Sequence, residues 1–288
     1  MEEATKQAVS ETIEQTVEAA EEIVRHPFTK RLAQLGFYTK GFLFIVIGAL
    51  AIMVALGDKD GELADPAGAL TRIAMAPYGK VILIIFIVGA VGHGAWNILR
   101  GAADVDNAGN SAAGIIKRIL AASVGFFYWF LAWTAWDIII TAQAIEGKSV
   151  TIQKTLTAIL LALPLGAFLV GLVGLTVIGA GIHECYSGVS GKFLEPFRLR
   201  ELKGINRVFF VTLGFFSFLA RGLIFGLIGY FFVMAAIDSN PNEAVGIDGA
   251  LLTLAQSYFG KTVLFVTAAG LVCHGVLSLY EARYRRIC

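Results

Sequence analysis

Long apolar runs separated by short polar segments make up most of this chain. Crossing a hydrocarbon core of about 30 Å takes roughly 20 apolar residues in an α-helix. Six runs reach that length: 36–56, 78–99, 115–141, 158–182, 208–237 and 261–280. The pattern predicts an all-α protein with six transmembrane helices. Composition agrees, because 57% of the 288 residues are hydrophobic and only 16% are charged, far from the balance of a soluble domain.

The segment 1–30 differs from the rest of the chain because it is acidic and carries few large apolar residues. It lacks the basic start and apolar core of a signal peptide, so we expect it to stay attached. Ile13, Val17, Ala20 and Val24 follow one another at helical spacing, and Pro27 would end the pattern. We expect a cytoplasmic amphipathic helix, either a solvated tail near the membrane or a docking helix for a cytoplasmic protein partner.

Lysine and arginine gather in alternate connectors. They are dense before the first run, between the second and third, between the fourth and fifth, and after the sixth. Because positively charged connectors stay on the cytoplasmic side, both termini are predicted to be cytoplasmic. The net charge of +1 and the lack of a basic patch with interleaved aromatic residues argue against nucleic-acid binding. The expected partner is the lipid bilayer.

Motifs of soluble enzymes are missing from the sequence. It has no Cys-x-x-Cys pair, Gly-rich phosphate loop, nucleophile elbow or zinc-protease helix. Cys185, Cys273 and Cys288 fall at or near the cytoplasmic ends of predicted helices, where thiols stay reduced. The sequence therefore weighs against an enzyme and predicts no disulfide and no metal site.

The chain repeats itself at an offset of 181 residues. KGFLFIVIG (40–48) falls on RGLIFGLIG (221–229), and GAVGHG (89–94) falls on GLVCHG (270–275). This alignment places His93 on His274. Fixed-period similarity of this kind is the signature of structural repeats.

A third copy lies between these two. An offset of 87 brings Gly79 onto Gly166, and a small loop adjustment brings Gly41 and Phe44 onto Gly125 and Tyr128. The chain is therefore predicted to be three helical hairpins, 31–107, 108–192 and 193–288. Each hairpin has an even number of spans, so all three enter the membrane the same way round. The predicted bundle has pseudo-threefold symmetry about the membrane normal.

Short motifs at matching places in the repeats resemble a known family, the bacterial integral-membrane proteins catalogued as domain of unknown function 1206. They are the helix starts Lys40-Gly41-x-x-Phe44 and Arg221-Gly222-x-x-Phe225, the Gly68-Ala69-Leu70 and Gly249-Ala250-Leu251 loops, and the helix entries Tyr78-Gly79-Lys80 and Phe259-Gly260-Lys261. The middle repeat lacks the Gly-Ala-Leu loop and a basic residue before Gly125. The resemblance implies six spans in a bacterial cytoplasmic membrane, but no activity.

The second helix of each hairpin carries polar residues at helical spacing on one face. Polar side chains that face lipid cost at least a few kcal/mol each, so we expect this stripe to face the bundle interior. Lys40 and Arg221, early in their predicted spans, are expected to reach lipid phosphates instead. The candidate interior stripe is His93, Asn97, Arg100, His183, Glu184, Ser187, His274, Ser278 and Glu281.

The stripe supports three interpretations. In the first, Arg100, Glu184 and Glu281 form ion pairs between repeats and the histidines bond to neighbouring helices. In the second, the stripe lines a titratable vestibule for a proton or a small solute. In the third, His93 and His274 ligate a haem; otherwise no cofactor is expected. We also expect Arg100 to pair with Glu281 or Glu184 below the histidines, closing the cytoplasmic mouth.

Overall fold

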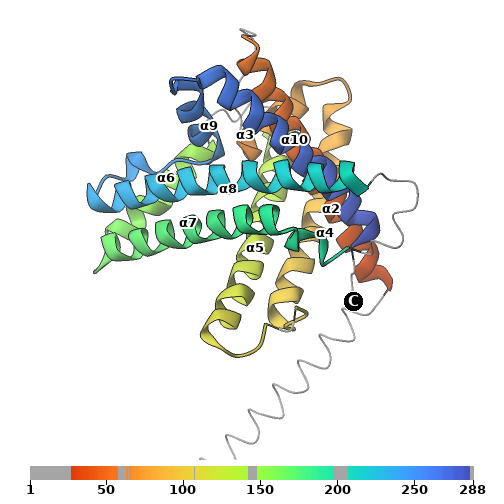
Figure 1. Ribbon diagram of the computed structural model, residues 1–288, viewed down its shortest axis with the longest axis horizontal. Coiled ribbons are helices and arrows are strands. Elements are labelled where there is room, and N and C mark those ends of the chain that lie inside the picture. Colours follow the sequence, from red (N-terminus) through yellow and green to blue (C-terminus); the bar gives the residue numbers. More distant parts are fainter. Residues whose placement is uncertain are drawn as a thin grey trace, which may run out of the picture.

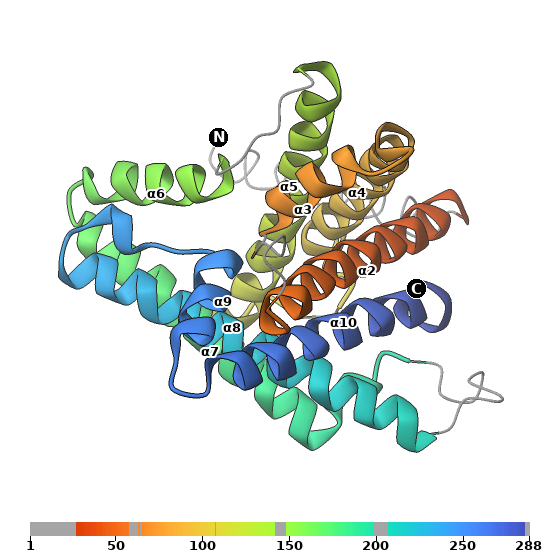
Figure 2. The same ribbon diagram turned by 90° about the horizontal axis from the view of Figure 1, so that it is seen from above.

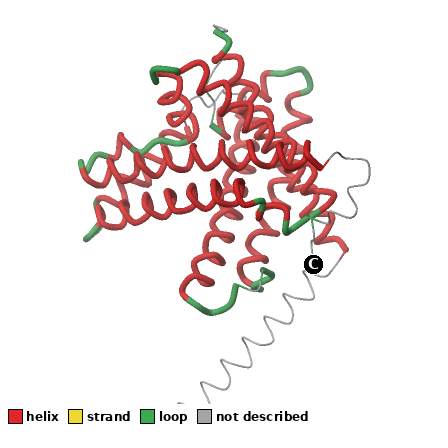
Figure 3. The backbone as a smooth tube through the Cα atoms, viewed as in Figure 1, coloured by secondary structure: helices red, strands yellow, loops and turns green. Residues whose placement is uncertain are grey.

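The computed structural model describes residues 27–57, 63, 65–106, 108–141, 148–197 and 207–285. The expected helix within 1–30 lies almost entirely outside these residues. The described part is built from helices joined by turns and loops, and contains no strand (Figure 3).

Six helices in the described ranges are long and apolar enough to cross a membrane. They correspond to the six runs of the sequence and confirm the predicted architecture. Their bounds are α2 Pro27–Ala55, α4 Gly79–Ala102, α5 Ala112–Thr141, α7 Gly166–Ser190, α8 Arg207–Ile237 and α10 Gly260–Tyr284.

Each repeat also contains a short helix before its second long one, which the sequence did not predict. These are α3 (Pro66–Met75), α6 (Lys148–Leu161) and α9 (Ile247–Gln256). The Gly-Ala-Leu segments expected as loops lie inside α3 and α9. Asp65 caps α3 by accepting a 2.7 Å hydrogen bond from the Gly68 amide, and Pro66 suits a first helical turn.

The fourth predicted span, 158–182, joined parts of two helices. Helix α6 ends at Leu161 and α7 begins only at Gly166. Between them stand Pro164, which disfavours a helical conformation in the residue before it, and Leu165 with a left-handed φ of 62°. A continuous apolar run therefore hides a sharp turn.

The closest helix packing joins neighbouring repeats. The second long helix of one repeat packs on the first long helix of the next: α4 on α5, α7 on α8, and α10 on α2. In Figure 1 the pair α4 and α5 runs downward whereas α7 and α8 extend to the left, and Figure 2 shows α2 beside α10. Because the third pairing returns to the first repeat, the three repeats form a closed ring with pseudo-threefold symmetry.

In each of these three contacts a glycine pair lets the two helix backbones touch. A Cβ atom added to either glycine would lie 2.6–2.8 Å from the carbonyl oxygen of the other, closer than real side chains approach. The residues occupy equivalent positions in the three repeats, so the same small-residue packing recurs around the ring. The pairs are Gly41–Gly275, Gly94–Gly125 and Gly181–Gly222. Helices α7 and α8 share a second such pair, Gly174 and Gly229.

The hairpin of the middle repeat is open. Helices α2 and α4 pack on each other, as do α8 and α10, but α5 and α7 do not pack comparably. In the closed hairpins Gly89 lies against Thr39 and Gly270 against Ala220. The equivalent of these glycines in the middle repeat is Thr176, whose side chain would occupy the contact. Helices α5 and α7 are accordingly the least buried, at 22% of their apolar windows against 39–50% for the others.

An apolar core fills the half of the bundle next to α3 and α9. Its largest side chains are almost wholly buried and come from the long and the short helices alike. This core separates the polar side chains described below from the end of the bundle where α3 and α9 lie. It includes Leu43, Ile47, Leu70, Leu83, Leu131, Ile224, Leu251, Leu264 and Leu271.

Candidate functional site

All six long helices contribute a polar side chain to one region, which we call the axial polar site. His93 lies within electrostatic range of Lys40 and Glu281. His274 lies in range of Lys40 and Arg221, and Arg221 binds Glu184 directly. Tyr128 lies in range of Arg221 and Glu281. The site consists of Lys40 (α2), His93 (α4), Tyr128 (α5), Glu184 (α7), Arg221 (α8), and His274 and Glu281 (α10).

Two ion pairs of this site join different repeats. The Lys40 Nζ lies 3.3 Å from Glu281 Oε2, and an Arg221 guanidinium nitrogen lies 3.2 Å from Glu184 Oε1. Arg285 also reaches Glu281, at 2.8 Å. Lys40 and Arg221 occupy equivalent positions, and the two carboxylates stand one helical turn apart on equivalent faces. The side chains of both pairs are only 12–19% exposed. The same electrostatic contact is therefore built twice around the ring.

The third junction, between α4 and α5, lacks both partners of this contact. Val124 stands where the other repeats have Lys40 and Arg221, and Asn97 stands where the second repeat has Glu184. In place of an ion pair, the Trp129 indole donates a 3.1 Å hydrogen bond to the Val91 carbonyl. Losing the cation and the carboxylate together avoids an uncompensated charge inside the bundle.

Both interior histidines pack edge-on against aromatic rings of the adjacent repeat. His93 meets Tyr128 at a centroid distance of 4.5 Å, and His274 meets Phe44 at 4.7 Å. Tyr128 and Phe44 are equivalent residues, so the two contacts are copies of one another. The second repeat has Ala180 in the histidine position, and the equivalent ring of Phe225 instead lies under the Arg221 guanidinium at 5.2 Å.

The two histidines differ in their hydrogen bonds. His274 Nδ1 lies 2.8 Å from the Ser217 hydroxyl of α8. The equivalent of Ser217 in the first repeat is Gly36, and a Cβ atom there would meet His93 Nδ1 at 2.7 Å. No hydroxyl fits at that place, and within the described ranges the buried His93 Nδ1 has no hydrogen-bond partner.

Several buried polar atoms around the site have no hydrogen-bond partner among the residues that the structure describes. Such atoms are rare in folded proteins, and each calls for an explanation. Five of them belong to the axial site or to its next helical turn: His93 Nδ1, Glu184 Oε2, Arg221 Nε, His274 Nε2 and Ser278 Oγ. These five hydrogen-bond donors and acceptors lie within the membrane-spanning helices.

Most of the polar stripe is buried as expected, but two of its members are not in the interior arrangement. His93, Asn97, Ser187, His274 and Ser278 are buried, whereas His183 is exposed. The prediction for Arg100 was wrong. Its Nε lies 2.6 Å from Asp106 at the end of its own repeat, and the carboxylates of Glu281 and Glu184 are bound by other cations.

The prediction that Lys40 and Arg221 reach lipid phosphates was also wrong. Helix α2 begins at Pro27 and α8 at Arg207, so both cations lie near the middle of their helices. From there they turn to carboxylates of neighbouring repeats. The sequence contained the signal, because a cation recurs at equivalent positions of the first and third repeats, while the second repeat lacks it and the first repeat lacks the carboxylate that would have faced it.

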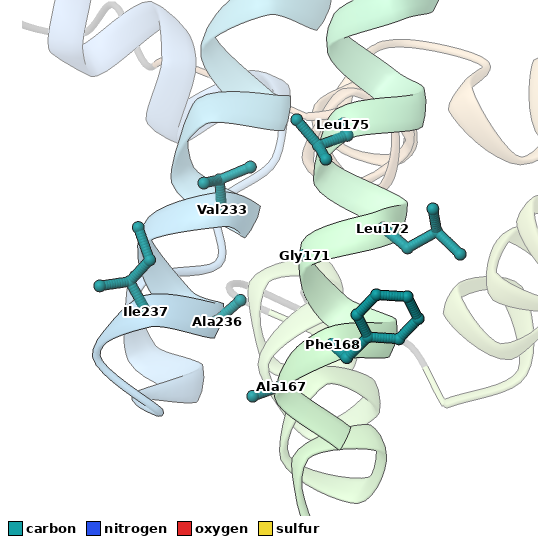
Figure 4. A pocket seen from close by; sticks show the side chains of 8 residues that line it. All are labelled: Ala167, Phe168, Gly171, Leu172, Leu175, Val233, Ala236 and Ile237. Atoms are coloured by element: carbon teal, nitrogen blue, oxygen red, sulfur yellow. The ribbon is translucent and has the colours of Figure 1, made fainter. Parts of the chain in front are cut away.

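A separate hollow lies between α7 and α8, away from the axial site. It is an apolar groove of about 310 Å³ lined by Ala167, Phe168, Gly171, Leu172, Leu175, Val233, Ala236 and Ile237 (Figure 4). Gly171 opens it, because the equivalent residues Ile84 and Phe265 in the other repeats are large. None of the side chains that line the groove is polar.

In the described ranges, Cys185 and Cys273 are free thiols. No three histidine, cysteine, aspartate or glutamate side chains of that part of the chain come together as metal ligands.

Comparison with known proteins agrees with the repeat structure. A family model described as "Domain of Unknown Function (DUF1206)" matches the chain three times, at 35–104, 120–191 and 216–285. The chain is 32% identical over 261 residues to "Uncharacterized protein YxxB" of Bacillus subtilis (strain 168), covering 91% of this chain and 93% of that protein. No solved structure matches it. The chain belongs to the DUF1206 family, as three tandem copies of its two-span repeat.

Proposed function

We propose that this protein forms a pathway for a small solute or a proton, and that the axial polar site is its occluded midpoint. The observation that carries the proposal is the set of five buried, unpartnered polar atoms beside two inter-repeat ion pairs. Ionisable residues inside a membrane bundle are costly and commonly mark the route of an ion or a substrate.

A purely structural site would be expected to satisfy its polar groups. Leaving a buried donor or acceptor unpaired costs about 1–3 kcal/mol, and more is expected for the charged Glu184 and Arg221. Water or a solute molecule at the junction of the three repeats would supply the missing partners.

The arrangement fits a conformation that is closed on both sides. Toward α3 and α9 the apolar core seals the axis. Toward the start of α2 and the end of α10, Glu281 is clamped between Lys40 and Arg285. Release of the Glu281 clamp would open the site to one side, and movement of the short helices would open it to the other.

Flux through the protein in liposomes tests this proposal. We expect pH-gradient decay, followed with an entrapped pH dye, or osmotic swelling with small solutes to exceed that of empty liposomes. Glu281→Gln should increase the rate because it weakens the clamp. The exposed-cation variant Arg283→Gln is the matched control and should behave as wild type. Background rates for wild type and Glu281→Gln with every probe would overturn the proposal.

A scaffold without transport is the second candidate function. The observation that favours it is the apolar core across one half of the axis. In that case the glycine contacts and ion pairs only hold the repeats together, and segment 1–30 would recruit a cytoplasmic protein. Flux at background together with a protein retained by the wild type and lost on deletion of 1–26 would favour this candidate.

Haem ligation by His93 and His274 stays a prediction. It requires a free imidazole nitrogen on each residue, and His274 Nε2 and His93 Nδ1 have no partner in the described structure. A Soret absorption band in the purified protein would support it, and a colourless preparation would dispose of it.

The proposed setting is the bacterial cytoplasmic membrane, with both termini in the cytoplasm. This orientation rests on the alternation of basic and acidic connectors. A cysteine at the exposed Asn242 should react with an impermeant thiol reagent on intact cells, and one at Asn110 should react only after permeabilisation. The reverse labelling pattern would invert the orientation.

A further inference from the structure

The axial polar site taken together with Arg285, which directly follows α10 and binds Glu281, carries more positive than negative formal charge. Three cations, Lys40, Arg221 and Arg285, share two carboxylates, Glu184 and Glu281. Counted over these five residues, the formal charge is three minus two, or +1. A net charge held inside a membrane bundle is unfavourable unless a counter-charge accompanies it.

Two of these cations also act on each other. Lys40 and Arg221 come from different repeats, and each has its own carboxylate, yet they lie within electrostatic range of one another and of His274. Like charges repel more strongly in the interior than in water because the local dielectric constant is low. A negative charge between the two cations would offset this repulsion.

Of the five unpartnered buried atoms around the site, Glu184 Oε2 can only accept a hydrogen bond, whereas three atoms on α8 and α10 can donate one. Arg221 Nε can only donate, and the Ser278 hydroxyl is free to donate. His274 Nε2 also donates when the Ser217 hydroxyl donates to Nδ1, which is one of the two tautomers compatible with that 2.8 Å contact. Helices α8 and α10 pack against each other. Arg221 stands one helical turn after Ser217, which contacts His274 across this junction, so Arg221 shares a helix face with Ser217.

We infer that the junction of α8 and α10, at Arg221, His274 and Ser278, binds a small monovalent anion, with Lys40 supplying further attraction. The inference rests on the proposed pathway and names the class of its solute. Water could accept from the same donors, but it would leave the net charge uncompensated. The ligand must be small, because His274 and Ser278 are at most 1% exposed.

Binding can be measured without any flux. The full-length protein in detergent is heated in sodium chloride, nitrate or formate, each compared with the bulky anion gluconate at the same ionic strength. Because a ligand that binds only the folded state stabilises it by mass action, small anions should raise the Tm in a saturable way. Arg221→Gln should abolish the saturable rise, whereas Arg283→Gln should keep it.

A milder variant guards against a simple failure to fold. Ser278→Ala removes one donor and little volume, so it should fold and shift the half-saturating anion concentration upward by about 3- to 10-fold, as expected for one lost hydrogen bond. Absence of a saturable rise in wild type, or the same half-saturating concentration in Ser278→Ala and wild type, would overturn the inference.

Failure of the inference and failure of the pathway are distinguishable. A saturable rise in Tm with small anions, without flux in liposomes, would support the anion site and contradict the proposed pathway. Flux of protons or neutral solutes, without a rise in Tm with small anions, would support the proposed pathway and contradict the anion site.

Discussion

Lys40 and Glu281 are 241 positions apart in the sequence, yet the lysine Nζ donates a 3.3 Å hydrogen bond to the glutamate carboxylate. This bond joins the first long helix to the last and thereby closes the ring of repeats. The corresponding ion pair between Arg221 and Glu184 joins the third repeat to the second. Charge pairing and ring closure are thus one feature of the fold.

The Arg221–Glu184 pair should stabilise the bundle measurably. Arg221→Ala leaves a largely buried carboxylate without its cation, so we expect the free energy of unfolding to fall by about 3 kcal/mol. The exchanged pair, Arg221→Glu with Glu184→Arg, should recover a large part of that loss. Arg100→Ala breaks a more exposed pair and should cost at most about 1 kcal/mol. Equal losses for Arg221→Ala and Arg100→Ala in reversible detergent unfolding would contradict this prediction.

Two glycines of α8, four residues apart, should respond differently to alanine. At Gly222 a Cβ atom would lie against Cys185 Sγ and 2.8 Å from the Gly181 carbonyl, whereas at Gly226 it would meet nothing within 4 Å. Gly222→Ala is expected to lower stability by about 2 kcal/mol through overpacking. Gly226→Ala should be neutral or stabilising, since alanine favours helix over glycine. Similar thermal stabilities of the two variants would show that α7 and α8 are not in contact here.

The open middle hairpin can be tested with three matched cysteine pairs in a background without native cysteines. Thr39/Gly89 and Ala220/Gly270 are in contact across the closed hairpins. A Cβ atom at Gly89 would lie 2.9 Å from Thr39 Cβ, and one at Gly270 would lie still closer to Ala220 Cβ. A disulfide needs about 3.5–4.5 Å between Cβ atoms, so pairs of cysteines at those positions should form disulfides after a small separation of the two helices. The equivalent pair, Ser123/Thr176, should stay reduced under the same oxidant. Efficient crosslinking of all three pairs would mean that α5 closes onto α7.

Acidic pH should stabilise the fold through Asp248 of α9, which lies outside the six spans. Burial raises the pKa of Asp248 above its usual value of 3.8, and the Asp65 carboxylate raises it further, while Lys154 opposes the shift. Because the folded chain binds this proton more readily than the unfolded chain, the stabilisation is full below the ordinary pKa. It is lost as pH rises through the raised folded-state pKa.

Asp248→Asn, which cannot ionise, should therefore be more stable than wild type at neutral pH. The difference in Tm should close as the pH approaches about 4. Asp238→Asn, at an exposed carboxylate, is the control. A constant difference between Asp248→Asn and wild type across this pH range would rule out the proposed ionisation.

Repetition in the sequence was enough to predict the ring. The alignment of Gly41 with Gly125 and Gly222 marks one partner of each backbone contact, and Gly94 with its equivalents marks the other. The lengths of the apolar runs located the six long helices. They could not show the turn at Pro164 and Leu165, because an apolar run looks the same whether one helix or two pass through it.

The partners of the charged residues could not be predicted in the same way. Helical spacing places Arg100, Glu184 and Glu281 on comparable faces, but the cation that reaches each carboxylate depends on which neighbouring helix lies opposite. Arg100 has Asp106 available within its own repeat. The first long helices of the first and third repeats begin well before Lys40 and Arg221, so these two cations lie near the middle of their helices. The missing information was the pairing of helices between repeats.

The central structural feature is a polar site built by all six long helices and closed by ion pairs between repeats. An experimental structure of the full chain in lipid nanodiscs, at a resolution that shows side chains, measures this directly. We expect Lys40 to pair with Glu281 and Arg221 with Glu184, and we expect density for a water molecule or an anion near His274 and Ser278. Lys40 and Arg221 directed to lipid headgroups, with each repeat pairing its own charges, would contradict this expectation.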